Sequence, residues 1–162
     1  MCERKYGYAP HVEFLGEKNL SFSYIPSHLY YILFEVIKNS LRATVEHHGS
    51  ESHCPPVKVV IGDGEQSEDV VIKVSDEGGG ISKPNMHRVF SYLFTTVRDS
   101  GKSEKLMDQA QNPLAGLGYG LPLARCHARY FHGDLELRTI AGYGTDAYVT
   151  LQRLSSEISD LV

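Results

Sequence analysis

Two glycine clusters in this chain have the composition of ligand-binding loops. The first, residues 116–122 (GLGYGLP), leads directly into a predicted helix. A flexible glycine loop ahead of the unpaired N–H groups of a helix N-terminus makes an anion site. It is not a P-loop, because no G-K-S or G-K-T follows, nor a dinucleotide-binding fingerprint, because a polar loop precedes it instead of a strand.

The second cluster is Asp76 with the glycines of residues 78–80. Three consecutive glycines let the backbone approach a ligand closely, with φ values that other residues avoid. An aspartate at the end of a buried strand is well placed to accept a hydrogen bond from an exocyclic amine. A plain turn that closes a buried strand would also have this sequence, and this segment alone leaves both interpretations open.

A third group of polar residues lies on one side of a predicted helix. Glu35, Asn39 and Arg42 follow one another at i, i+4 and i+7, and Lys38 lies beside them at i+3. Helical spacing places all four roughly opposite an apolar stripe at residues 29–41. On this helix alone, the pattern also fits the solvated face of an amphipathic helix.

The elements that must position these residues are those of an α/β chain. We expect strands at residues 20–25, 57–61, 70–75, 135–139 and 147–154, and helices at about 28–48, 84–94 and 121–132. Strands 57–61 and 70–75 should form a hairpin. Ser27 is the expected N-cap of the first helix, and Gly133 the C′ residue of the last. Residues 97–112 are polar and poor in aromatics, which indicates a mobile loop.

Composition narrows the class of protein. The 162 residues suit one domain, and 41% hydrophobic with 22% charged residues is ordinary for a globular chain. A formal charge of -4 argues against a nucleic-acid binder that works by bulk charge. No apolar run approaches a membrane span. The three cysteines are far apart, which excludes a disulfide framework or a cysteine-rich zinc site.

The ordered set of motifs resembles the N, G1, G2 and G3 boxes of the Bergerat-fold (GHKL) ATPases. In chain order these motifs are E-x-x-K-N-x-x-R-A, D-x-G-x-G-I, G-x-G-x-G-L and G-x-G-T-D. The words PLAGLGYGLP and GYGTDA make residues 20–155 similar to the catalytic domain of pyruvate dehydrogenase kinases. The resemblance implies an α/β two-layer sandwich, with helices on one face of a mixed sheet and ATP between helix and lid.

The resemblance also implies a role for each matching residue. Glu35 would be the general base toward a substrate serine, and Asn39 would bind Mg²⁺. Asp76 would accept a hydrogen bond from the adenine amine, assisted by Thr145 through water. The other nucleotide-binding residues implied are Lys38, Arg42, Gly78, Gly80, Thr95, Thr96, Gly116, Leu117, Gly118, Tyr119, Gly120 and Leu121. Among these, the two threonines would close a lid over the nucleotide.

Domain organisation and partners are implied in the same way. Residues 1–19 would link to an N-terminal helical domain, residues 20–155 would be the ATP-binding domain, and residues 156–162 a frayed tail. The expected partners are ATP or ADP, a 2-oxoacid dehydrogenase complex of the mitochondrial matrix whose lipoyl domain docks elsewhere, and a second copy of the chain. We expect no nucleic acid and no membrane. A branched-chain ketoacid dehydrogenase kinase, a histidine-kinase domain and a non-catalytic nucleotide-gated module remain alternatives.

The sequence departs from the kinase pattern one helical turn before the expected base. Many pyruvate dehydrogenase kinases have a histidine there, whereas this chain has Tyr31. A phenol cannot carry the same charge near neutral pH, so we expect Glu35 to respond less to pH than in those kinases. The eight histidines show no metal-ligand spacing and are expected at the surface. Cys126 is expected to be a buried small hydrophobe.

Overall fold

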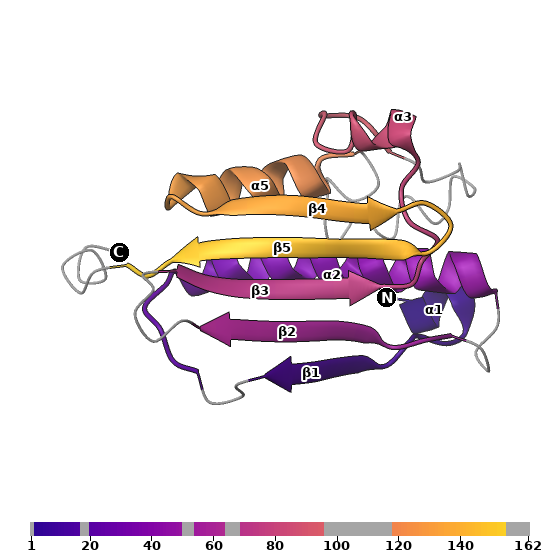
Figure 1. Ribbon diagram of the computed structural model, residues 1–162, viewed down its shortest axis with the longest axis horizontal. Coiled ribbons are helices and arrows are strands. Elements are labelled where there is room, and N and C mark those ends of the chain that lie inside the picture. Colours follow the sequence, from indigo (N-terminus) through magenta and orange to yellow (C-terminus); the bar gives the residue numbers. More distant parts are fainter. Residues whose placement is uncertain (1, 17–19, 50–53, 64–68, 96–117, 155–162) are drawn as a thin grey trace.

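The computed structural model describes residues 2–16, 20–49, 54–63, 69–95 and 118–154. The elements run in the order α1 (Cys2–Tyr6), β1 (Val12–Gly16), α2 (Pro26–His48), β2 (Val57–Asp63), β3 (Asp69–Asp76), α3 (Lys83–Met86), α5 (Gly120–Tyr130), β4 (Asp134–Ile140) and β5 (Gly144–Gln152) (Figure 1). Within these ranges no helix combines the length and the apolar character needed to cross a bilayer.

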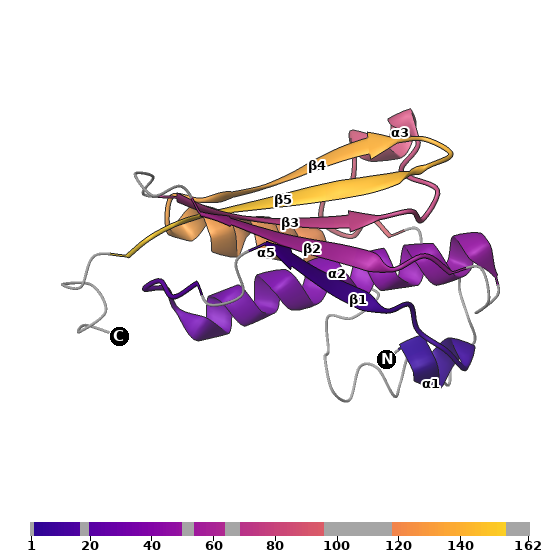
Figure 2. The same cartoon turned by 60° about the horizontal axis from the view of Figure 1, so that its bottom comes forward.

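The strands form one mixed sheet in the order β1-β2-β3-β5-β4. β1 pairs in parallel with β2, and the other three pairings are antiparallel. The predicted hairpin of β2 and β3 is therefore confirmed. Figure 2 shows α2 and α5 on one side of this sheet, which confirms the two-layer α/β architecture.

Burial of apolar side chains between the two layers explains why these elements form. Val70, Ile72 and Val74 alternate along β3 and point toward the helices, as do Val149 and Leu151 of β5. Each is nearly or fully removed from water, so each contributes about 1.5–3 kcal/mol of hydrophobic stabilisation. The period-2 pattern of the sequence therefore reflects one covered sheet face.

The strand predicted at residues 20–25 is wrong. This segment has no regular secondary structure, and the strand at this end of the sheet is β1 instead. Phe22 and Tyr24 alternate because both pack against the core from an extended segment that makes no ladder. Residues 12–16, which we expected in a linker, form the edge of the sheet.

Helix α2 begins two residues before the predicted start. Ile25 is the N-cap, and Pro26 occupies the first turn, where its missing N–H costs no hydrogen bond. The deepest apolar contacts come from Ile32 and Val36. The four residues of the predicted stripe are only partly buried: Leu29, Leu33, Ile37 and Leu41. The buried residues of α2 differ from the predicted stripe because α2 packs against both the sheet and α5.

The other two helices are shorter than predicted. The helix predicted at residues 84–94 is a single turn, α3, followed by further turns. α5 ends at Tyr130, and His132, with φ 60°, takes the left-handed conformation predicted for Gly133. Gly133 is needed for a different reason, because a Cβ there would collide with the backbone carbonyl of Thr150 in β5.

Candidate functional site

A cavity of about 570 Å³ lies between α2, the end of β3, the α3 region and the start of α5. It gathers most of the residues that the motifs single out. Those that line it are Glu35, Lys38, Asn39, Arg42, Asp76, Gly78, Gly80, Thr95, Gly118, Gly120, Leu121 and Thr145. Thr96, Gly116 and Leu117 lie outside the described residues. The four motifs therefore meet around one space, although they are far apart in the chain.

Tyr119 is the one described residue of the predicted set that does not line the cavity. It is the N-cap position of α5, and its ring lies 5.8 Å from that of Tyr92. Its side chain therefore packs against the segment that follows α3.

Several lining residues were missed by the sequence analysis. Glu46 and His47 extend the polar side of α2 by one more turn, and helical spacing from Asn39 could have found them. Asn85 and Phe94 come from the α3 region, and no motif marks them.

Asp76 is buried at the end of β3, with 8% of its surface exposed. Its Oδ1 accepts hydrogen bonds from the backbone N–H groups of Gly78 at 3.0 Å and Thr145 at 3.2 Å, and Ser40 adds a side-chain hydrogen bond. Burial raises the pKa of Asp76, and these hydrogen bonds oppose the increase. The protein thus holds a desolvated carboxyl group in a fixed orientation at the cavity wall, where it can accept from an amine.

The glycine run after Asp76 packs tightly on its surroundings. A Cβ on Gly78 would lie 2.5 Å from the Cβ of Ala43 and 2.9 Å from the backbone nitrogen of Thr44 in α2. Gly80 has φ +69°, and a Cβ there would meet the carbonyl of Ile140. These glycines bring the loop against a helix and a strand end, so they shape the cavity wall through protein packing.

Glu35 is also buried, with 3% of its surface exposed, so α2 does not present it on a solvated face. The Nζ of Lys38 donates to both of its carboxylate oxygens at 2.5 Å. A Cβ on Gly120 would collide with Oε2 of Glu35, so the start of α5 closely approaches the carboxylate. A buried charge is stable only when it is paired, and Lys38 supplies that pairing.

Tyr31 lies one turn before Glu35 and contacts His127, which is paired with His28. Its ring centroid lies 4.8 Å from that of His127 in α5, and Nδ1 of His127 lies 3.0 Å from Nδ1 of His28. Burial, and secondarily His28, lower the pKa of His127. Both histidines are partly buried, so the expectation of surface positions is wrong for this pair. Cys126 is exposed, so the expectation that it is buried is wrong too.

Comparison with known proteins agrees with this geometry. Residues 24–155 match the family model of the histidine kinase-, DNA gyrase B- and HSP90-like ATPases. The chain is 45% identical over 157 residues to the mitochondrial pyruvate dehydrogenase (acetyl-transferring) kinase of Arabidopsis thaliana, covering 95% of this chain and 42% of that protein. The Schizosaccharomyces pombe kinase of the same name is 46% identical over 167 residues, covering 99% of this chain and 39% of that protein.

A human relative gives the same pattern. Isozyme 4 of the mitochondrial pyruvate dehydrogenase (acetyl-transferring) kinase is 41% identical over 164 residues, covering 97% of this chain and 38% of the human protein. The chain thus spans about two fifths of the length of these curated relatives. The motif order, the cavity that unites the motifs and the family match over residues 24–155 lead to one conclusion: the chain belongs to the histidine kinase-, DNA gyrase B- and HSP90-like ATPases.

Proposed function

We propose that this chain is the ATP-binding catalytic domain of a protein serine kinase that acts on a 2-oxoacid dehydrogenase subunit in the mitochondrial matrix. The observation that carries the proposal is the buried carboxylate of Glu35, paired with Lys38 in the same cavity as Asp76. Similarity to mitochondrial pyruvate dehydrogenase kinases over nearly the whole chain supports the pyruvate dehydrogenase complex as the substrate.

The two buried carboxyl groups would divide the work. Asp76 accepts a hydrogen bond from the adenine amine, with Thr145 beside it. Glu35 accepts the proton of the substrate serine while the serine oxygen bonds to the γ-phosphorus and ADP leaves. Such transfer depends on positioning and charge neutralisation more than on covalent chemistry by the protein. Lys38 and Arg42 supply positive charge along α2.

The donor set near Glu35 fits Mg²⁺. Asn39 lies one turn after Glu35 and lines the same cavity, and its amide oxygen is a hard ligand. Mg²⁺ usually keeps several waters and binds substrate phosphates, so one amide oxygen from the protein can suffice. When bound, the ion would neutralise part of the charge of the phosphates. Among the described residues, no three histidines, cysteines or acidic residues come together in a competing metal site.

Residues around the start of α5 would hold the phosphates and close the site. The backbone amides of residues 118–121 would cradle the phosphate oxygens at the helix N-terminus. Thr95 would cover the nucleotide. Thr96 and the loop expected at residues 97–112 lie outside the described residues. Residues 20–155 would form the catalytic domain together with β1, which completes its sheet, so residues 1–19 would be more than a link to a lipoyl-docking domain. The tail expected at residues 156–162 lies outside the described residues.

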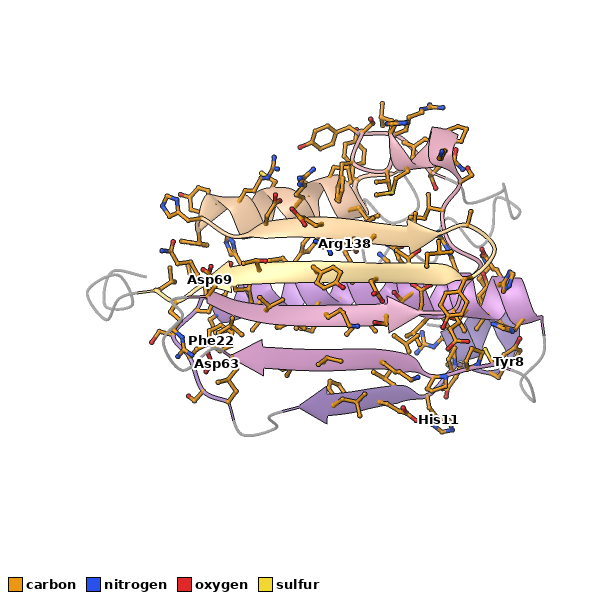
Figure 3. All side chains as sticks on the ribbon, in the orientation of Figure 1. Tyr8, His11, Phe22, Asp63, Asp69 and Arg138 are labelled. Atoms are coloured by element: carbon orange, nitrogen blue, oxygen red, sulfur yellow. The ribbon has the colours of Figure 1, made fainter. Side chains whose placement is uncertain are left out.

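We also propose that the chain forms a homodimer through the sheet face opposite the helices. That face carries polar and charged side chains that contact one another. The Nζ of Lys73 lies 3.8 Å from Oδ2 of Asp146, and the Arg138 guanidinium lies 5.0 Å from the centre of the Tyr148 ring. Arg138 extends from β4 on this face (Figure 3). A dimer formed here would depend on complementary polar groups instead of an apolar patch.

Titration calorimetry with Mg-ATP and Mg-ADP tests the nucleotide site. We expect wild type to bind both and Asp76→Ala to bind neither, because the acceptor for the adenine amine is gone. A folded wild-type chain that binds no nucleotide would contradict the proposal.

Phosphoryl transfer is tested with the dehydrogenase subunit and labelled ATP. We expect acid-stable phosphoserine, and a loss of about 10²–10⁴-fold in Glu35→Gln with nucleotide binding retained. Acid-labile phosphohistidine would favour the histidine-kinase alternative. Nucleotide binding without any transfer would favour the nucleotide-gated interaction module.

A further inference from the structure

We propose that Tyr6 is a positioning residue for the nucleotide cavity: its hydroxyl holds Glu46 against Arg42, so that helix α1 sets the affinity for the nucleotide. The inference rests on the proposed function, because Mg-ATP is taken as the ligand. It adds to the site a residue that precedes the matched family region, residues 24–155.

The first contact links two distant parts of the chain. The Tyr6 hydroxyl donates a hydrogen bond to Oε1 of Glu46 at 2.6 Å, across 40 positions of sequence. α1 lies beside the C-terminal half of α2, as Figure 2 shows, and the two helices are in contact. A hydrogen bond of this length to a carboxylate is of the stronger, charge-assisted kind.

The second contact reaches the cavity wall. Nε of Arg42 lies 3.8 Å from the same Oε1 atom of Glu46, and both side chains line the cavity. Within the described part of the chain, the buried Nε of Arg42 has no hydrogen-bond partner. The position of the Arg42 side chain therefore depends on the Glu46 carboxylate, and Tyr6 restrains that carboxylate.

The charges of Glu46 and Arg42 determine whether loss of the Tyr6 hydroxyl raises or lowers the nucleotide affinity. Glu46 brings a carboxylate to a cavity that would receive an anionic ligand, and like charges weaken binding. The Tyr6 hydrogen bond keeps this carboxylate beside Arg42. Without the hydroxyl, the half-exposed Glu46 side chain is free to sample positions nearer the ligand, and Arg42 loses its fixed orientation. Both changes lower the affinity for the nucleotide.

The Tyr6 hydroxyl can be removed without loss of the packing that holds α1 in place. Cys2 is the buried residue of this helix, whereas Tyr6 is only partly buried. Burial first, and then the hydrogen bond to Glu46, raise the pKa of Tyr6, so the phenol stays protonated and remains a donor at physiological pH. Tyr6→Phe therefore removes the hydrogen bond while it keeps the ring.

Calorimetry with Mg-ATP on the full chain tests the inference. We expect Tyr6→Phe to raise the Kd about fivefold, which is the range for one hydrogen bond. Arg42→Met should raise the Kd by itself, and adding Tyr6→Phe to Arg42→Met should raise it by less than Tyr6→Phe does in the wild-type background. The control is Tyr130→Phe, which alters an exposed tyrosine on α5 and should leave the Kd unchanged.

Two results would overturn the inference. One is a Tyr6→Phe variant that binds as wild type does. The other is an equal loss in the wild-type and Arg42→Met backgrounds, because a purely structural role of Tyr6 would not depend on Arg42. If wild type itself binds no Mg-ATP, the proposed function and this inference fall together. Failure of the inference alone therefore remains distinguishable.

Discussion

At the scale of single residues, the burial of Asp76 favours ligand binding and lowers the stability of the folded protein. Burial raises its pKa, so the folded protein disfavours the charged form. The stability that this group contributes is complete below the pKa of the unfolded chain and is lost as pH rises through the folded pKa. The ionised form therefore works against folding. Its retention in a buried position fits a group kept for an amine ligand.

Asp76→Asn should separate the two effects. We expect a free energy of unfolding at pH 7 that equals or exceeds that of wild type, because the charged form is no longer buried. Nucleotide affinity should fall at least about tenfold, since the amide can place an N–H where an acceptor is needed. Urea denaturation and calorimetry measure the two quantities. A variant that loses stability and keeps its affinity would contradict this account.

His127 makes stability depend on pH in the opposite direction. Its pKa is lowered, first by burial and then by His28, so the folded protein disfavours the charged ring. Stability is therefore lost as pH falls through the unfolded pKa, which is about 6.5, toward the folded value. His127 lies against His28 and the Tyr31 ring.

His127→Gln should flatten this dependence. We expect the difference in unfolding free energy between pH 7.5 and pH 5.5 to be smaller in the variant than in wild type. Urea denaturation at the two pH values measures it. His132→Gln, at an exposed position two residues beyond the end of α5, is the matched control and should keep the wild-type slope. Equal slopes for wild type and His127→Gln would show that the pair does not titrate in this range.

The residue scale also shows what sequence patterns can and cannot provide. The ordered set of motifs placed Glu35 and Asp76 in one site through its resemblance to the GHKL ATPases, whereas each motif alone left its interpretation open. The Tyr6–Glu46 contact has no such signal, since neither residue belongs to a motif and only tertiary packing brings them together. The pairing of His28 with His127 was missed for the same reason.

At the scale of elements, the start of α5 is shaped by the carboxylate that it faces. A glycine in a helix is usually about 1 kcal/mol less favourable than alanine. Gly120 occupies the first position of α5 because any Cβ there would collide with the Glu35 carboxylate. The local preference of the helix is overridden by the approach of α2.

Gly120→Ala should therefore destabilise the domain, by about 1–3 kcal/mol, instead of stabilising the helix. It should also reduce phosphoryl transfer, because the Glu35 carboxylate must move. Thermal unfolding and the kinase assay measure the two effects. Gly62→Ala is the control, since a Cβ at Gly62 would meet only an ordinary contact, 3.8 Å from the carbonyl of Val71. A Gly120→Ala variant as stable and active as wild type would contradict the proposed contact.

Predictability differed between elements for physical reasons. β3 was predicted almost to its ends because its alternating valines and isoleucine are buried on one face. β1 was missed because four of its five residues are exposed, so hydrophobic alternation carries no signal there. The segment 20–25 was overpredicted because an extended chain that packs on the core alternates like a strand.

At the scale of the whole molecule, the N-terminal strand completes the sheet. β1 pairs with β2 from Val12 opposite Val57 to Gly16 opposite Ile61. β2 contributes the buried Val57 and Val59, so the edge that β1 covers belongs to a strand of the core. The matched family region begins at residue 24, after β1.

A shortened chain that begins at residue 24 should therefore be less stable, and associate more readily, than the full chain. We expect a lower melting temperature and association into large particles, because the uncovered edge of β2 offers unpaired backbone groups to other chains. Light scattering during a thermal ramp measures both. The full chain is the control. A shortened chain that melts with the same midpoint and stays dispersed would show that β1 is dispensable.

The position of β1 in the chain also matters during synthesis. Residues 12–16 leave the ribosome before α2 and before β2, since domains emerge from their N-terminal side. The strand that covers the edge is therefore already available when β2 is made. A protein that ended its sheet with a C-terminal strand would instead expose that edge until translation finished. Because β1 precedes β2 in the chain, the unpaired edge of β2 is open to other chains for a shorter time during synthesis.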